Sequence, residues 1–517
     1  MNAPVLAERS VGGSSALRGG RPWRPTPYLV FGLLCWLVVS LAYWRVPLCC
    51  DAGLDAAVVE RLAADLTHPR HPVAALPGDG SPAHTPYTVV QGALARVTGL
   101  GGWEAVRLAG PVNLAVLLTG VGRFVRMLTP RPWAPVLALA ALTLLWGTEA
   151  GPTGVSLALL PLTAGLGDPS VCALGLTLWA WALTGTRARD TGRVRFVGPS
   201  GLPSPLGYAA LGVLYGLIAL IDPLVGVGAG AGAVALIGCG RLRALPRWGW
   251  AAATMAAVLW TWPYYDVFTA GFAHATGDRS VLSPSTGSLG GACWAALLAG
   301  IPALWLRARR GSWRDPLLLM ALPGLTVVAY GLLGAGSVDG ALLALALVPP
   351  QCALAVELAA PRPWPAWRRG LGAVAAGGAC AGLLGVQGAA VLPGSFDRTG
   401  SDRSASGMSY AWAAQHIERG DVVLAEGRDT VHGLAGYGVN TVAPVVPDPA
   451  LDESARNDRL AAVRTYLSPG STAAERAAVV RRYHVRWILL TRRRTLPTGA
   501  VVVTWSERTG EVLARVG

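Results

Sequence analysis

Apolar residues form long uninterrupted runs between residues 28 and 393, and short polar segments separate these runs. A helix needs about 20 apolar residues to cross the hydrocarbon core of a bilayer. The pattern therefore predicts about eleven membrane-spanning helices. They are expected at residues 28–46, 108–121, 133–146, 171–183, 206–221, 224–239, 248–262, 289–306, 316–333, 341–358 and 371–391.

The composition indicates a polytopic α-helical membrane protein. Hydrophobic residues make up 52% of the 517-residue chain and charged residues only 14%, whereas soluble domains contain about 25% charged residues. The net charge of +14 comes from arginine, because the chain contains no lysine. Arginine clusters between apolar runs are typical of membrane topology rather than of nucleic-acid binding. We therefore expect a lipid bilayer as partner and no nucleic acid.

These arginine clusters also predict the orientation. One cluster precedes the first span, and the others occupy every second connection, which eleven spans place on one side of the membrane. Arginine favours the cytoplasmic side of a membrane. We therefore expect a plasma membrane protein in which residues 1–27 form a disordered cytoplasmic tail. A cleavable signal peptide is the alternative, since Ser40, Leu41 and Ala42 have the form of a processing site. The apolar run continues past Ala42, which favours an anchor.

Residues 394–517 differ sharply from the membrane domain expected at 28–393. They are charged and lack a long apolar run, and their pattern predicts a small extracytoplasmic α/β domain. Helices are expected at 409–418 and 472–482. Strands are expected at 421–425, 485–490 and 501–505.

The first outer loop, residues 48–106, concentrates the candidate chemistry. Residues 51–65 predict a helix in which Asp51 and Asp55 are one turn apart and share a face with Val58 and Leu62. Acids on the buried face of a helix at the membrane exit indicate function. An N-cap role for Asp51 and a helix-dipole role for Asp55 are the structural alternatives.

Three histidines follow in a proline-rich stretch, which predicts an irregular loop. His68, His71 and His84 do not have a zinc spacing on one element, so we expect a substrate-contacting or merely solvated loop and assign no metal ligand. The glycine string at 226–240 lies inside an apolar run, where small residues that allow close helix packing explain it better than nucleotide binding.

The order of these features resembles the GT-C superfamily of membrane glycosyltransferases. The resemblance rests on the acid-bearing first loop, the amphipathic stretch 87–100, and the span that opens at Arg107 and continues to Asn113. The passages at 262–266 and 475–490 add to it. Many members carry adjacent acids in the first loop, but here Ala52, Gly53 and Leu54 separate the two aspartates. Which acid acts, and whether a divalent metal takes part, is left open.

The resemblance implies transfer of a hexose or pentose from a polyprenyl-phosphate donor to a glycan, lipid or protein acceptor outside the cytoplasm. Such transfer needs a carboxylate base, for which Asp51 is the first candidate and Asp55 the second. Arg70 and Arg107 are candidates for the leaving phosphate, with snorkelling as the alternative role. The predicted substrate-binding residues are completed by His68, His71, His84, Tyr87 and Asp222.

Helix capping is the alternative role for Asp222, and also for Glu149 and Asp168 in the next outer loop. Two other functions stay open at this point. A lipid-linked saccharide transporter, or flippase, would show internal pseudo-symmetry and interrupted midplane helices. A non-enzymatic membrane scaffold would use the outer domain to bind a partner.

Overall fold

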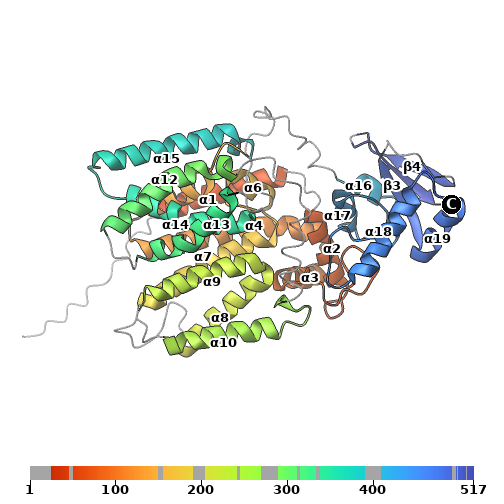
Figure 1. Cartoon of the computed structure of the whole chain (residues 1–517), viewed down its shortest axis with the longest axis horizontal. Coiled ribbons are helices and arrows are strands. Elements are labelled where there is room, and N and C mark those ends of the chain that lie inside the picture. The colour runs from red at the N-terminus through yellow and green to blue at the C-terminus, as the bar shows by residue number, and fades with distance from the viewer. Residues whose placement is uncertain are drawn as a thin grey trace, which may run out of the picture.

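The computed structural model (Figure 1) has a helical bundle at one end and a small sheet with its own helices at the other. The cytoplasmic tail expected over residues 1–27 lies outside the described residues up to residue 24. The structure describes residues 25–45, 51–149, 155–189, 204–240, 245–268, 289–310, 315–333, 338–390, 409–491, 496–497, 499–507 and 509–516.

Each of the predicted spans overlaps one described helix. The bundle consists of α1 (Pro27–Arg45), α4 (Gly102–Leu128), α5 (Ala134–Leu144), α7 (Pro169–Arg189), α8 (Ser204–Ile221), α9 (Pro223–Gly238), α10 (Leu245–Trp260), α12 (Leu289–Arg310), α13 (Pro316–Leu332), α14 (Gly340–Leu358) and α15 (Ala366–Gly385), with the short α6 (Leu159–Ala164) and η3 (Gln387–Ala390). Among the described helices, α1, α4, α12 and α14 are long and apolar enough to cross a membrane. The number of crossings stays a prediction.

Arginine-bearing helix ends lie together at one end of the bundle. The Arg131 guanidinium, at the start of α5, donates to the carbonyl of Val356 near the end of α14 at 2.6 Å. Arg189, at the end of α7, donates to the carbonyl of Met127 at the end of α4. The contacts thus agree with the threading of the chain, and we call this side the arginine end. Which side of a membrane it faces stays a prediction.

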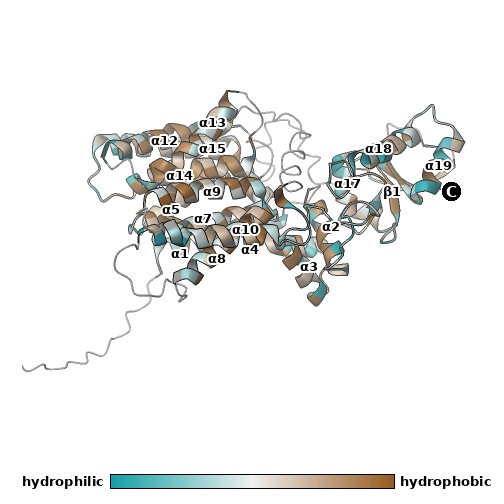
Figure 2. Ribbon diagram, turned by 60° about the horizontal axis from the view of Figure 1, so that its bottom comes forward, coloured by the Kyte–Doolittle hydropathy of each residue, from teal (hydrophilic) through white to brown (hydrophobic). Residues whose placement is uncertain are grey.

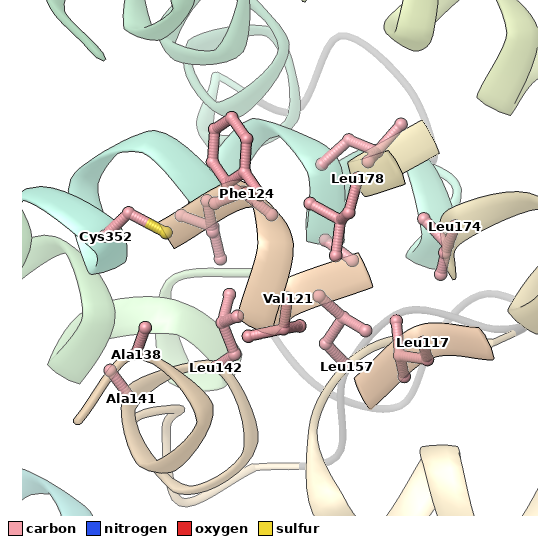
Figure 3. Close-up of a cluster of buried hydrophobic side chains, with 14 of the residues drawn as sticks. Leu117, Val121, Phe124, Ala138, Ala141, Leu142, Leu157, Leu174, Leu178 and Cys352 are labelled. Carbon is pink, nitrogen blue, oxygen red and sulfur yellow. The ribbon is translucent and has the colours of Figure 1, made fainter. Parts of the chain in front are cut away.

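The bundle helices are mostly apolar (Figure 2), and a few polar side chains such as Asn113, Thr177 and Gln351 are buried among them. Leu117, Val121 and Phe124 of α4 are buried in one cluster with Leu174 and Leu178 of α7, and Figure 3 shows these side chains among the members of that cluster. Apolar side chains that meet inside a bundle pack more closely than they would against lipid, and they therefore gain dispersion contacts. The contact between α4 and α7 is therefore one part of the apolar core, to which the deeply buried α14 also contributes.

The glycine string of α9 serves helix packing, as predicted. A Cβ atom at Gly232 would lie 2.4 Å from the indole of Trp181 on α7. The Trp181 indole N–H donates to the carbonyl of Ala229, one turn earlier, at 2.9 Å. Only glycine leaves room for this tryptophan against the helix backbone.

Residues 51–98, in the first predicted loop, form two helices and an irregular connection between them. The helices are α2 (Asp51–Ala64) and α3 (Pro86–Thr98). α3 begins where predicted because Thr85 caps it, accepting from the Thr88 amide at 3.2 Å, and Pro86 follows at the first helical position. It ends at Gly99, whose φ of 75° is left-handed.

The C-terminal part carries a five-stranded mixed sheet in the order β2-β1-β3-β5-β4. β1 pairs in parallel with β2 and β3, whereas β5 pairs antiparallel with β3 and β4. Its elements are α16 (Ala411–Ala414), β1 (Val422–Leu424), α17 (Arg428–Ala435), β2 (Asn440–Thr441), α18 (Glu453–Leu467), α19 (Ala473–Tyr483), β3 (Val485–Thr491), β4 (Ala500–Trp505) and β5 (Glu511–Val516). The strands and the second helix predicted here are present, but the helix expected over 409–418 is a single turn, α16. Independent folding as a domain stays a prediction.

Candidate functional site

The acid-bearing helix α2 packs its apolar face inward, as its sequence predicts. Val58 and Leu62 are buried, and Asp55 on the same face is half-buried. Asp51 is the first residue of the helix, and its side chain lies outside the described part. The structure therefore locates one of the two candidate bases, Asp55.

Gly53, which lies between the two aspartates, allows α2 to approach α17 closely. A Cβ atom there would lie 2.5 Å from the carbonyl oxygen of His432 in α17. On the other side of this contact, a Cβ at Gly436 would lie 2.8 Å from the Gly53 carbonyl and 2.7 Å from the ring of Trp103. α2 thus packs backbone to backbone against a helix of the C-terminal part (Figure 1). That contact sets the position of Asp55.

Asp55 lies within electrostatic range of two tyrosines, one of which is also within range of Arg107. Its carboxylate acts electrostatically on the hydroxyls of Tyr43 and Tyr87, and the guanidinium of Arg107 also acts on Tyr43. The Tyr43 hydroxyl donates to the carbonyl of Val106 at 3.3 Å. The end of α1 therefore contacts α4 here, and α3 and α4 both pack against α2.

Tyr87 is held by Asn113. The Tyr87 hydroxyl donates to Asn113 Oδ1 at 3.1 Å and lies 2.8 Å from its Nδ2, which also donates to the Leu166 carbonyl at 3.0 Å. Burial raises the pKa of the Tyr87 phenol well above its usual value; the bond from Asn113 opposes this, and the nearby charges of Asp55 and Asp168 add to it. The phenol therefore remains protonated and can act as a donor.

The two predicted phosphate-binding arginines lie in different surroundings. Arg107 is half-buried, and its Nε atom is enclosed without a hydrogen-bond partner in the described part of the chain. Arg70 is exposed on the irregular loop, where its backbone forms an isolated bridge with Pro77. Of the two, only Arg107 joins the group around Asp55.

The three loop histidines do not gather into one site. His68 is exposed beside Thr67. His71 is buried, and its Nε2 lies 3.3 Å from Asp448 Oδ2 of the C-terminal part. His84 is fully buried near the same carboxylate. Among the described residues, no group of three or more His, Cys, Asp or Glu side chains is placed to hold a metal ion.

The buried histidines and Asp448 connect the first loop to the C-terminal part. The Ser81 hydroxyl donates to Asp448 Oδ2 at 2.7 Å. Burial raises the pKa of Asp448, but bonds from His71, the Ala450 amide and Ser81 outweigh it, and the pKa falls to about 2. Burial lowers the pKa of His84 to about 4, against the opposing charge of Asp448. At neutral pH Asp448 is therefore ionised and His84 is neutral.

The other candidate acids include helix caps. Asp222 is buried and accepts from the amides of Leu224 and Val225 at 2.9 and 3.1 Å, at the start of α9. Asp168 accepts from the Ser170 amide at 2.7 Å, directly before α7. Capping, the structural alternative given for both, is observed. Although Asp168 acts as a cap, it also belongs to the surroundings of Tyr87.

No family model and no curated protein matches the sequence. Solved structures match nearly all of it. ArnT from Cupriavidus metallidurans bound to undecaprenyl phosphate is 15% identical, with a TM-score of 0.56 over 94% of this chain and 98% of ArnT. Arabinofuranosyltransferase AftD from Mycobacteria is 17% identical, with a TM-score of 0.56 over 95% of this chain and 40% of AftD. This chain has the GT-C fold.

A third solved structure shares this fold with a lower TM-score. The archaeal oligosaccharyltransferase AglB from Archaeoglobus fulgidus, in complex with an inhibitory peptide and a dolichol-phosphate, is 10% identical, with a TM-score of 0.50 over 90% of this chain and 69% of AglB. The GT-C resemblance predicted from the sequence is therefore confirmed for the fold. At such identities the donor, the acceptor and the acting residues are not carried over.

Within this GT-C fold, sequence reasoning did not assign Tyr43 or Asn113 to the site. A signal for both existed, since each is a polar group inside an otherwise apolar helix, where such a group needs a partner. Their partners lie on other helices, and local patterning could not identify them. The same holds for Asp448, which is far from the loop in sequence but bonds to it.

Proposed function

We propose that this chain is an integral membrane glycosyltransferase that moves a sugar from a polyprenyl-phosphate donor to an extracytoplasmic acceptor. The observation that supports it best is the group of Asp55, Arg107, Tyr43 and Tyr87 at one end of a GT-C bundle. It combines a half-buried carboxylate with a guanidinium that has an enclosed, unbonded Nε. Base chemistry and anion binding need these two groups.

In the proposed reaction, an α2 carboxylate accepts the proton of an acceptor hydroxyl. The hydroxyl oxygen forms a bond to the anomeric carbon of the sugar as the bond from that carbon to the phosphate oxygen breaks. The phosphate leaves with the electron pair and remains attached to its polyprenyl chain. Asp55 is the base supported by its surroundings, and Asp51 remains the alternative one turn earlier.

Arg107 is assigned to the leaving phosphate. A guanidinium donates two parallel hydrogen bonds to an oxyanion, and such bonds are stronger when the site is partly enclosed. The Tyr87 phenol has a single proton, which it donates to Asn113 Oδ1, and it can donate this proton to a substrate oxygen near the same carboxylate by exchanging that bond. No step is assigned to a metal ion.

The experiment compares Asp55→Asn with a matched control, Asp65→Asn, in the purified full-length protein. Asp65 is exposed just after α2, where it bonds Thr67. Turnover is measured with a panel of undecaprenyl-phosphate hexoses and pentoses, and binding with undecaprenyl phosphate alone. We expect Asp55→Asn to lose turnover about 10²- to 10⁴-fold while binding is kept, and Asp65→Asn to keep both.

Unchanged turnover in Asp55→Asn and full loss in Asp51→Asn would transfer the base role to Asp51. A flippase would show lipid translocation without sugar transfer, and a scaffold would be indifferent to both aspartates. In cells, deletion of the gene should cause a lipid-linked sugar to accumulate. If no such lipid accumulates and no glycan changes, the transferase proposal is wrong.

A further inference from the structure

A cavity of about 460 Å³ lies between α5, α14 and α15, away from the site around Asp55. This volume falls within the range of about 300–1,000 Å³ that is usual for ligand sites. Its wall consists of aliphatic side chains such as Leu145, Leu354 and Ala355, together with small residues of α15. Trp364 and Arg369 complete the lining.

The cavity lies toward the arginine end of the bundle. Arg368, next to Arg369, bonds Glu357 at the end of α14 at 2.9 Å. The far end of α15 leads to Gln387, which accepts from the amide of Leu160 in α6, in the loop region that precedes Asp168. The mouth of the cavity and the Asp55 site therefore lie at opposite ends of the bundle, and α15 runs between these ends.

The shape of the cavity fits one lipid tail in one leaflet. The lining residues of α15 run from Arg369 to Ala379, which spans about 15 Å at 1.5 Å per residue. The hydrocarbon core is about 30 Å thick, so this distance corresponds to one leaflet. Ala373 and Ala376, which also line the cavity, are exposed on the side of the bundle. A tail can therefore enter laterally.

The charge at the mouth indicates an anionic headgroup. Arg369 is exposed and is the only charged residue in the described lining. It has no carboxylate partner in the part of the chain that the structure describes, whereas Arg368 and Arg310 both pair with Glu357. The indole N–H of Trp364 already donates to the carbonyl of Ala360 at 2.9 Å. Arg369 is thus the lining group available to bind a phosphate.

We propose that this cavity is a binding site for an anionic phospholipid, with one acyl tail against α5, α14 and α15 and the phosphate at Arg369. The site is separate from that of the proposed donor lipid, whose phosphate we assign to Arg107. Basic pockets between membrane helices bind phospholipid headgroups in this way. The proposal does not depend on the transferase reaction.

Native mass spectrometry of the full-length protein tests this proposal, by titration with phosphatidylglycerol or phosphatidylcholine of identical tails. We expect phosphatidylglycerol to bind about fivefold more tightly, which is the effect of one arginine near a headgroup. Arg369→Gln should abolish this preference, and Ala376→Trp should weaken both lipids by filling the cavity. The matched control is Arg309→Gln, which removes an exposed arginine stacked on Trp305 at 3.7 Å, outside the cavity.

Equal binding of the two lipids by the unaltered protein would overturn the proposal, as would equal effects of Arg369→Gln and Arg309→Gln. Arg369 is exposed, so its replacement should leave the fold intact. The Arg369→Gln variant therefore tests the proposal even if the Ala376→Trp protein does not insert into the membrane. A third titration uses undecaprenyl phosphate. If that lipid alone shows the dependence on Arg369, the cavity belongs to the donor lipid rather than to a phospholipid.

Discussion

Arg107 is half-buried in the first two turns of α4, and its Nε is enclosed without a hydrogen-bond partner among the described residues. The Nε atoms of Arg61, Arg307 and Arg368 are enclosed in the same way, but each of these arginines bonds a side-chain oxygen through another nitrogen atom. Burying a charged donor without a partner is unfavourable, so a site that does so gains free energy when an anion binds. This is the physical reason to assign the leaving phosphate to Arg107 rather than to the exposed Arg70.

Replacement of Arg107 by glutamine should weaken binding of undecaprenyl phosphate about 10- to 100-fold. Hydrogen bonds to charged groups contribute about 1.5–3 kcal/mol, and each 1.4 kcal/mol changes affinity about tenfold. Binding is measured by titration of the purified protein. Arg96→Gln is the control, because Arg96 is an exposed arginine on neighbouring α3. Equal losses in both variants would show nonspecific attraction.

His84 gives a residue-scale prediction about pH. Its pKa falls from 6.5 to about 4 on burial, near Asp448, His71 and Asp79. The unfolded state takes up a proton below pH 6.5, but the folded state does so only near pH 4. Stability contributed by neutral His84 is therefore present above pH 6.5 and is lost as the pH falls to about 4, by about 3 kcal/mol at most.

The measurement is the thermal unfolding midpoint of the full-length protein between pH 7.5 and pH 4.5. His84→Gln should flatten the dependence on pH, whatever its effect on the midpoint itself. His68→Gln should leave the slope unchanged, because His68 is exposed. A slope that His84→Gln does not alter would assign the effect to other groups. Asp448 contributes little, since its stabilisation is lost mainly as the pH falls from its ordinary value of 3.8 to about 2, below this range.

At the scale of elements, local patterning predicted α2 well, marked as amphipathic the stretch that forms α3, and predicted the C-terminal strands only in part. Both helices carry their own signals, such as the cap at Thr85. β5 was not predicted, because its first residue, Glu511, is a buried acid, which argues against a strand. Tyr410 and Thr430 each donate to this carboxylate at 3.3 Å. These partners lie about 80 or more positions away, so the local sequence could not reveal them.

The contact between α2 and α17 yields a test by Gly53→Ala. The added methyl group would meet the His432 carbonyl at 2.5 Å, and overpacking of this kind costs about 1–3 kcal/mol. We expect a lower unfolding midpoint and, since α2 carries Asp55, reduced turnover. Gly230→Ala is the control, because a Cβ at Gly230 meets nothing within 4 Å. That variant should be neutral or slightly stabilising, by about 0.5–1 kcal/mol.

The whole molecule combines a GT-C bundle with a C-terminal part that completes the first loop. Arg61 of α2 donates to Asn440 Oδ1 of β2 at 2.7 Å, and Ser81 bonds Asp448. The loop and the sheet are thus one packed unit at the end of the bundle opposite the arginine end. Hydrophobic patterning and arginine spacing predicted the bundle, whereas this unit depends on bonds between residues more than 360 positions apart.

Orientation in the membrane is the last prediction, and it concerns the whole chain. If the arginine end faces the cytoplasm, cysteine at Gln415 in the C-terminal part should react with a membrane-impermeant maleimide in intact cells. Cysteine at Arg309, exposed at the end of α12, should react only after lysis. The unaltered protein supplies the background from its own cysteines. The opposite labelling pattern would invert the topology and place the Asp55 site on the cytoplasmic side, where an extracytoplasmic acceptor could not reach it.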